Sequence, residues 1–117
     1  MEFFIKQNAT LPILKMDVIK DGRTDSYKTF YDEIDNANIR FSMKSEDDGI
    51  QKVFMKKAYI TDKIRTNPDS PREYLIYYKW DEKDTNKKGR FIGEFSIVLE
   101  TGELIAPIVS NLYINII

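Results

Sequence analysis

Apolar and polar side chains alternate along most of this chain, and this period of two constrains the fold more than any other feature. Between positions 38 and 44, Ile39, Phe41 and Met43 are separated by polar residues. The same alternation recurs at 74–80, 91–99 and 112–116. Because successive side chains of a strand point to opposite faces of a sheet, each stretch has one apolar face. Such faces need a second sheet to cover them, so the sequence predicts two packed β-sheets.

About seven strands are expected, a number typical of small β-sandwiches. Their predicted ranges are 2–6, 11–19, 38–44, a less regular strand within 50–60, 73–80, 90–99 and 104–117. The last strand is expected to break near Pro107, since proline has no amide hydrogen for a central ladder. Glycine-containing turns at 45–49 and 100–103 predict short hairpins. Polar loops are expected at 67–71 and 81–89.

One segment departs from the period of two. Between positions 24 and 36, apolar side chains recur at helical spacing, at Tyr27, Phe30, Tyr31 and Ile34. Asp25 or Ser26 is suited to cap the start of a helix. We therefore expect a short helical insertion that crosses between the sheets, and an irregular loop is the alternative.

Length and composition indicate one globular domain over residues 1–117. A chain of 117 residues with 42% hydrophobic and 32% charged residues is typical of a globular protein. No apolar run approaches the roughly 20 residues that a membrane-spanning helix needs, so no membrane contact is expected.

The missing residue types exclude several kinds of chemistry. The chain has no cysteine and no histidine, which removes disulfides, thiolate zinc sites and histidine-based catalysis. The formal net charge of −1 does not favour nucleic-acid binding. We expect no catalytic residues, no cofactor and no bound metal.

Three charged clusters allow a chemical interpretation, and each has a simpler one. Glu46, Asp47 and Asp48 have the ligand chemistry for calcium, but acidic hairpin turns are common. The carboxylates Asp81, Glu82 and Asp84 resemble a glycosidase pair, but small sandwiches rarely offer the required cleft. The pairs Lys56-Lys57 and Lys87-Lys88, near Tyr77 and Tyr78, are suited to grip a nucleic-acid strand, but lysines also prevent pairing between exposed strands. The simpler interpretation is favoured in each case.

The order of the motifs resembles the immunoglobulin-like N-terminal domain of phage baseplate upper proteins. FIKQNATLPILKMDV at 4–18 is similar to the opening of that family, where a short strand and a polar turn precede a Leu-Pro that begins the next strand. IDNANIRFSM at 34–43 resembles its third strand. The second half is similar through its aromatic strand ending in Trp80, the Asp84-Thr85 loop, Gly89, the Thr101-Gly102 hairpin, Pro107 and a closing Tyr-Ile-Asn-Ile strand.

The resemblance implies an immunoglobulin-like antiparallel β-sandwich in a phage tail or baseplate. It implies other phage structural proteins as partners, several copies per particle, and a virion location after synthesis in the host cytoplasm. Two departures stand out: segment 22–34 is longer and more aromatic than in the family, and the family domain usually begins a longer protein. A chain that stops at the last strand is expected to act as an adaptor, plug or decoration.

Apolar residues at positions that the alternation would expose are the expected protein contacts. These candidate interface residues are Phe3, Tyr27, Phe30, Tyr31, Leu75, Tyr77 and Ile117. The alternative for Leu75 and Tyr77 is burial beneath segment 24–36. Trp80 and Phe95, on the more apolar faces of their strands, are expected in the core.

Four functions remain in competition. The favoured hypothesis is a non-enzymatic structural protein of the tail, baseplate or neck. A capsid decoration or head-fibre anchor is the first alternative. A small carbohydrate-binding module, which would stack sugar rings on Trp80 or Tyr78, is the second. A carboxylate-based enzyme is the least favoured.

Overall fold

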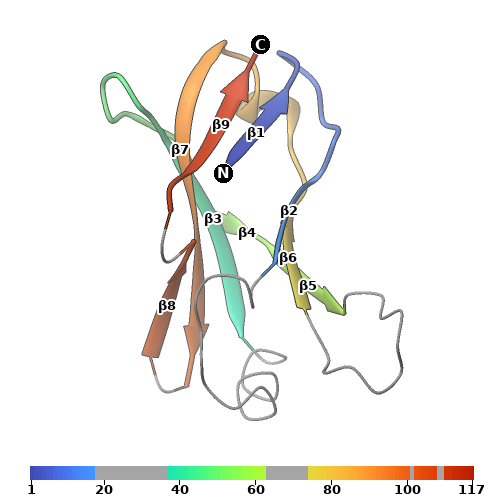
Figure 1. Cartoon of the computed structure of the whole chain (residues 1–117), viewed down its shortest axis with the longest axis vertical. Helices are drawn as coiled ribbons and strands as arrows, with labels where there is room; N and C mark the ends of the chain where they lie inside the picture. The colour runs from blue at the N-terminus through green and yellow to red at the C-terminus, as the bar shows by residue number, and fades with distance from the viewer. Residues whose placement is uncertain (18–36, 63–73, 101, 108–109) are drawn as a thin grey trace.

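The computed structural model describes residues 1–17, 37–62, 74–100, 102–107 and 110–117, and nearly all of its regular structure there is strand (Figure 1). The expected all-β fold is confirmed. The strands are β1 (Glu2–Ile5), β2 (Leu14–Asp17), β3 (Asn38–Ser45), β4 (Gln51–Lys57), β5 (Tyr59–Asp62), β6 (Tyr74–Tyr78), β7 (Gly89–Leu99), β8 (Gly102–Ala106) and β9 (Leu112–Ile116), and η2 (Glu82–Asp84) is a short 3-10 turn.

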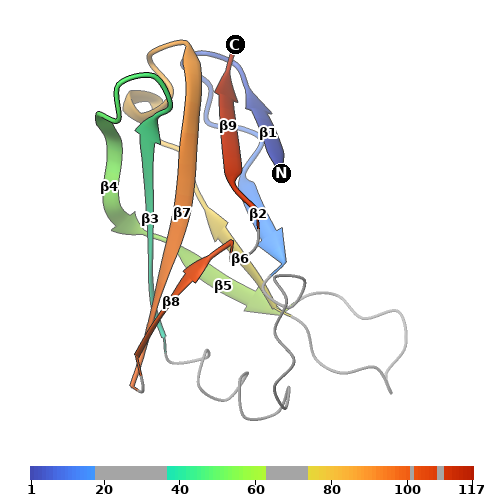
Figure 2. The same cartoon turned by 60° about the vertical axis from the view of Figure 1, so that its left-hand side comes forward.

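The strands form two sheets that face each other (Figure 2). The larger sheet has the order β1-β9-β7-β3-β4, and the smaller has the order β2-β6-β5. β1 runs parallel to β9, whereas the other pairs are antiparallel. The long strand β7 pairs with β9 through one half and with β8 through the other. β8 and β9 together therefore act as one interrupted partner strand.

The core lies between the sheets and is centred on aromatic rings. Phe41 of β3 is fully buried, and its ring centroid lies 4.6 Å from that of Tyr78 and 5.0 Å from that of Phe95. The Trp80 ring packs edge-on against the Phe41 ring, with their centroids 5.7 Å apart. The predicted burial of Trp80 and Phe95 is confirmed, with 5% and 0% of their surfaces exposed. The alternation of β3, β6 and β7 thus places one set of side chains in a common core.

The predicted strand within 50–60 is in fact two strands in different sheets. β3 pairs Met43 with Val53 and Phe41 with Lys56, so two residues of β4 lie opposite the single residue Ser42. This β-bulge interrupts the period of two. The chain then passes Ala58, whose amide donates to the carbonyl of Ile39 at 2.9 Å, and continues as β5 of the smaller sheet.

The other strand predictions differ from the structure mainly at their ends. The predicted strand 104–117 is divided into β8 and β9, and its expected break near Pro107 is confirmed because β8 ends at Ala106. The two divided strands raise the number in the described ranges from about seven to nine. The turn at 45–49 forms as predicted, with Gly49 at a φ of 72°. The expected helical insertion at 24–36 lies outside the described residues.

Gly93 of β7 is expected to resist substitution because it faces the core at close range. An added Cβ would lie 3.1 Å from the Phe41 ring and 3.4 Å from Ile114. Gly93→Ala is therefore expected to lower the free energy of unfolding by about 1–3 kcal/mol, the usual cost of overpacking a core. Urea unfolding would measure this. The neighbouring exposed Glu94→Ala serves as the control, and equal stability of the two variants would show that the core yields easily at Gly93.

Candidate interaction surface

The carboxylate of Asp84 is a buried structural group. Its side chain accepts hydrogen bonds from the Tyr78 hydroxyl at 2.6 Å and the Asp81 amide at 2.9 Å, and it pairs with Lys56 Nζ at 2.7 Å. Burial raises the pKa of Tyr78, and the hydrogen bond to Asp84 raises it further. Both carboxylate oxygens are thus occupied, and Asp84 ties the loop after β6 to β4.

Thr85 connects the same loop to the start of the chain through two hydrogen bonds. Its hydroxyl donates to the Ala9 carbonyl at 2.8 Å, and its own carbonyl accepts from the Asn8 amide at 2.9 Å. Asp81 and Glu82 are exposed, whereas Asp84 and Thr85 are buried. The loop therefore holds three parts of the molecule together, and its acidic residues do not face one another across a cleft.

The acidic turn at 46–48 also has structural contacts. Asp48 Oδ1 accepts from the Ile50 amide at 3.0 Å, and this hydrogen bond lowers the pKa of Asp48. The Glu46 carboxylate lies 3.5 Å from Arg90 Nε. Within the described ranges, no group of three acidic residues is placed to hold a metal ion. These carboxylates shape the hairpin between β3 and β4.

The two aromatic residues predicted to stack sugar rings, Trp80 and Tyr78, are buried. Trp80 and Tyr78 are only 5% and 3% exposed, and they contact each other edge-to-face at 5.3 Å. Among the described aromatic residues, Phe4, Phe54 and Tyr59 are the exposed ones. A sugar ring therefore has no access to the two aromatic residues on which that interpretation depended.

The predicted interface residues divide into inward and outward positions. Phe3 is half-buried on the inward side of β1, and its ring stacks on Trp80 with the centroids 5.9 Å apart. Phe4, with the opposite orientation, is 57% exposed, and Ile117 is 53% exposed. Leu75 and Tyr77 are half-buried. The remaining predicted residues, Tyr27, Phe30 and Tyr31, lie outside the described ranges.

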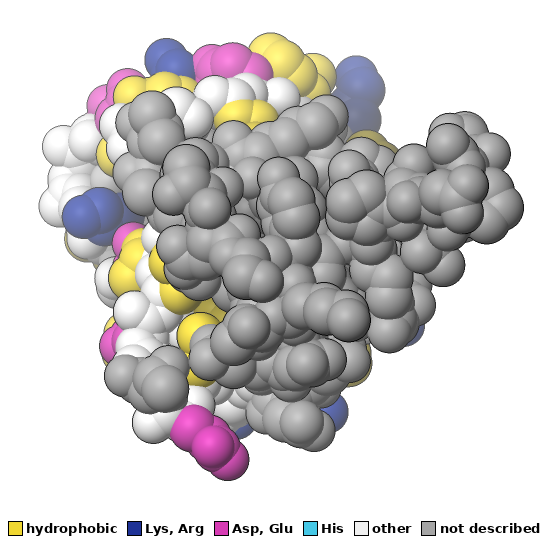
Figure 3. Space-filling model, turned by 60° about the horizontal axis from the view of Figure 1, so that its bottom comes forward, with side chains coloured by type: hydrophobic (Ala, Val, Ile, Leu, Met, Phe, Trp, Pro, Cys, Tyr) yellow, Lys and Arg dark blue, Asp and Glu magenta, His cyan; other side chains and the backbone are white. Residues whose placement is uncertain are grey.

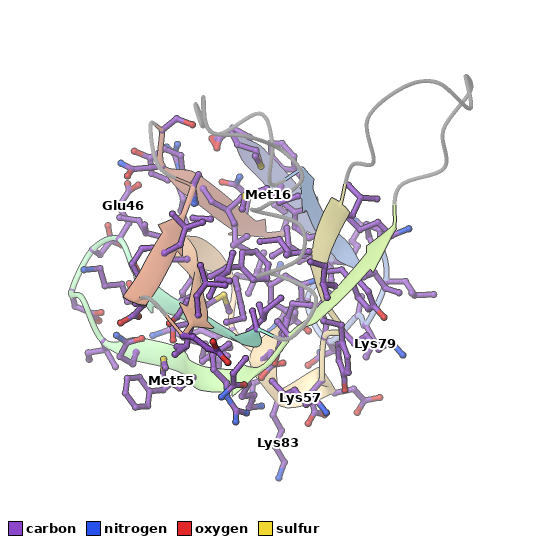
Figure 4. The ribbon with its side chains drawn as sticks, turned by 90° about the horizontal axis from the view of Figure 1, so that it is seen from below. Met16, Glu46, Met55, Lys57, Lys79 and Lys83 are labelled. Carbon is purple, nitrogen blue, oxygen red and sulfur yellow. The ribbon has the colours of Figure 1, made fainter. Side chains whose placement is uncertain are left out.

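Tyr77 belongs to an aromatic and basic cluster on the outer face of the smaller sheet. In register, Tyr77 lies between Lys15 of β2 and Tyr59 of β5. The two tyrosine rings stack at 5.3 Å, and Lys57 Nζ and Lys79 Nζ lie 5.3 Å and 5.5 Å from the Tyr59 ring centroid. Seen from below, Lys57 and Lys79 lie on the same side of the molecule (Figure 4). We call these five residues the tyrosine–lysine face.

A second surface follows the outer strand β4. Ile50, Phe54 and Met55 are 67%, 70% and 40% exposed, and we call them the apolar β4 edge. The bulge places both Phe54 and Met55 opposite Ser42, whose hydroxyl accepts from the Met55 amide at 2.9 Å. Among the described strands, β4 pairs with β3 alone. The adjacent apolar pair Phe54-Met55 was the sequence signal for this surface.

Other exposed apolar residues are more scattered. Val98 of β7 and Ile105 of β8 are 43% and 41% exposed. Figure 3, which brings the lower end of Figure 1 forward, shows hydrophobic side chains at the surface there among charges of both signs. The outer face of the larger sheet holds a small hollow lined by Ser42, Lys44, Gln51, Ile92 and Glu94. The described surface thus favours broad contacts over a deep pocket.

In the parts of the chain that the structure describes, no helix is long and apolar enough to cross a membrane. No protein-family model, curated protein or solved structure matches the chain.

Proposed function

We propose that this chain is an immunoglobulin-like structural module of a phage particle, in the tail, baseplate or neck, and that it works by binding other structural proteins. The strand order supports the immunoglobulin-like part. The smaller sheet, β2-β6-β5, has the B-E-D order of such domains, and β9-β7-β3-β4 has the order of strands G, F, C and C′. Phe41 occupies the middle of β3, where antibody domains place a tryptophan. The phage context rests on the similarity of the sequence motifs.

The apolar β4 edge is the observation that carries the binding role. Phe54 leaves 70% of its surface in solvent next to Met55 on β4, and the exposed Ile50 directly precedes this strand. Exposed apolar residues that gather in one area are typical of protein interfaces, and aromatic residues are enriched at interface centres. A standard interface buries about 800 Å² on each partner. The total accessible surface here is 7336 Å², so such a contact would use about a tenth of it.

Side-chain burial suits this surface better than the addition of a strand. The bulge at Phe54 and Met55 distorts the outer edge of β4, and the same strand carries lysines at positions 52, 56 and 57. Bulges and lysines both discourage strand pairing at sheet edges. We therefore expect the partner to cover Phe54 with a pocket of its own rather than to extend the sheet.

The variant Phe54→Ser tests this surface. Because Phe54 is exposed, its loss is expected to change the free energy of unfolding by no more than about 0.5 kcal/mol. Burial of a phenylalanine contributes about 1.5–3 kcal/mol, so the affinity for the partner is expected to fall about tenfold or more. The measurement is the amount of the chain in purified phage particles assembled with limiting amounts of each variant.

Leu11→Ser is the matched control, because Leu11 is 68% exposed and precedes β2 of the smaller sheet, whereas β4 belongs to the larger sheet. Normal incorporation of Leu11→Ser together with poor incorporation of Phe54→Ser supports the proposed surface. Incorporation of Phe54→Ser at the wild-type level, or an equal loss in both variants, would contradict it.

A further inference from the structure

We infer that the tyrosine–lysine face (Lys15, Lys57, Tyr59, Tyr77 and Lys79) binds an extended acidic segment of the partner protein. The inference rests on the proposed function, because it specifies the chemistry of the partner. It concerns a different surface from the apolar β4 edge, although Lys57 belongs to the same strand as Phe54. The two surfaces can therefore be tested separately.

Positive charge is concentrated on this face although the chain as a whole is slightly negative. Lys15, Lys57 and Lys79 are all exposed, while the formal net charge of the chain is −1. None of the three forms a salt bridge with another described residue. Lys56, in contrast, is paired with the buried Asp84. The three ammonium groups on the face are thus suited to meet carboxylates supplied by another molecule.

The pairing registers explain why these groups share one face. Lys15, Tyr77 and Tyr59 are directly opposite one another on β2, β6 and β5. Lys79 follows the end of β6 and Lys57 ends β4, and the ammonium groups of both lie within 5.5 Å of the Tyr59 ring centroid.

The packing of the rings favours carboxylates over nucleic-acid bases or sugars. A base or sugar needs an open aromatic face on which to stack. The Tyr59 ring already stacks on Tyr77 and has two ammonium groups within 5.5 Å of its centroid. A stacked ligand would have to displace one of these neighbours, whereas a carboxylate can approach the ammonium groups without disturbing the rings.

Spacing within the sheet indicates an extended segment. Neighbouring strands lie about 4.8 Å apart, so Lys15 and Tyr59 are separated across β6 by about 10 Å of sheet. Alternate residues of an extended chain repeat at about 6.6–6.8 Å. A segment with Asp or Glu at alternate positions directs these side chains to one side, so it can reach more than one lysine of the face.

Carbodiimide cross-linking of purified particles tests the contact in place, since the reagent joins an amine to a carboxylate that touches it. We expect mass spectrometry to find Lys15, Lys57 or Lys79 linked to Asp or Glu of one other particle protein. The exposed Lys6, Lys44 and Lys88 are the comparison set. Links confined to the comparison set, or the absence of links at the tyrosine–lysine face, would contradict the inference.

A binding assay on the purified full chain provides the second arm. The probes are a fluorescent peptide of three Glu-Val repeats and a fluorescent oligothymidylate of twelve nucleotides. We expect the peptide to bind more tightly than the oligonucleotide and to dissociate as salt is raised towards about 0.5 M. The variant K15E/K57E/K79E is expected to lose at least tenfold in peptide affinity, whereas K6E/K44E/K88E, with the same change in net charge, is not.

These results distinguish the two proposals. Tighter binding of the oligonucleotide, no binding of the peptide, or equal losses in the two triple variants would overturn the inference while leaving the proposed function in place. Selective peptide binding by a chain that is absent from particles would support the face and overturn the proposed function instead.

Discussion

Phe95→Ala is expected to lower the free energy of unfolding by about 3–5 kcal/mol, as is typical when a buried aromatic side chain is truncated. Phe95 is completely buried, and its ring lies 5.0 Å from Phe41 at the centre of the core. The substitution removes apolar burial and leaves a cavity between two sheets that cannot easily close it. Since small domains are stable by only about 5–15 kcal/mol, this loss is a large share of the total.

Urea unfolding followed by fluorescence gives the measurement, because the chain has a single tryptophan, Trp80, and it is buried in the same core. Phe4→Ala is the control, since Phe4 is 57% exposed and on the outer side of β1. We expect the midpoint of the control to stay near that of the wild type. If the two variants had the same midpoint, the arrangement of inward and outward residues would be wrong.

Asp84→Ala is the second substitution for which we expect a large effect, about 2–4 kcal/mol lower stability. Removing this carboxylate leaves the Tyr78 hydroxyl and the Asp81 amide without their acceptor, and a buried group without a partner costs about 1–3 kcal/mol. Lys56 adds less than a fully buried partner would, because its side chain is 44% exposed and water can replace the lost ion pair.

Two further variants distinguish the loss of the buried Asp84 hydrogen bonds from the simple loss of a negative charge in this loop. Glu82→Ala removes an exposed carboxylate from the same loop, and we expect it to change stability by no more than about 0.5 kcal/mol. Tyr78→Phe removes one hydrogen bond and is expected to cost about 1 kcal/mol. Thermal unfolding of the three variants is the measurement, and equal stability of Asp84→Ala and Glu82→Ala would show that the buried network contributes little.

The strands that could be predicted from sequence are those with uninterrupted alternation. Residues 38–44 and 90–99 correspond closely to β3 and β7, because both strands place every second side chain in the core. The passage from β4 to β5 could not be predicted in this way. Its bulge sets two residues against Ser42 and shifts the alternation, so the change of sheet at Ala58 has no clear local signal.

The surface was less predictable than the fold for a related reason. Phe3 and Phe4 are equally apolar, and only the pairing of β1 with β9 decides which of them faces outward. The contact between Lys56 and Asp84 joins residues 28 positions apart, on elements whose proximity depends on the whole fold. Tyr59 was not among the predicted interface residues, because the irregular alternation of segment 50–60 gives no clear outward face there. Its ring nevertheless stacks on that of the predicted interface residue Tyr77.

The most direct test of the proposed role is the composition of purified phage particles. Quantitative mass spectrometry should find the chain in a fixed ratio to the tail or capsid proteins, and a density map should place its two packed sheets at symmetric sites in contact with other chains. The position of that density would also separate a tail, baseplate or neck module from a capsid decoration. Absence of the chain from purified particles, with the protein present as a free monomer in infected cells, would contradict the proposal.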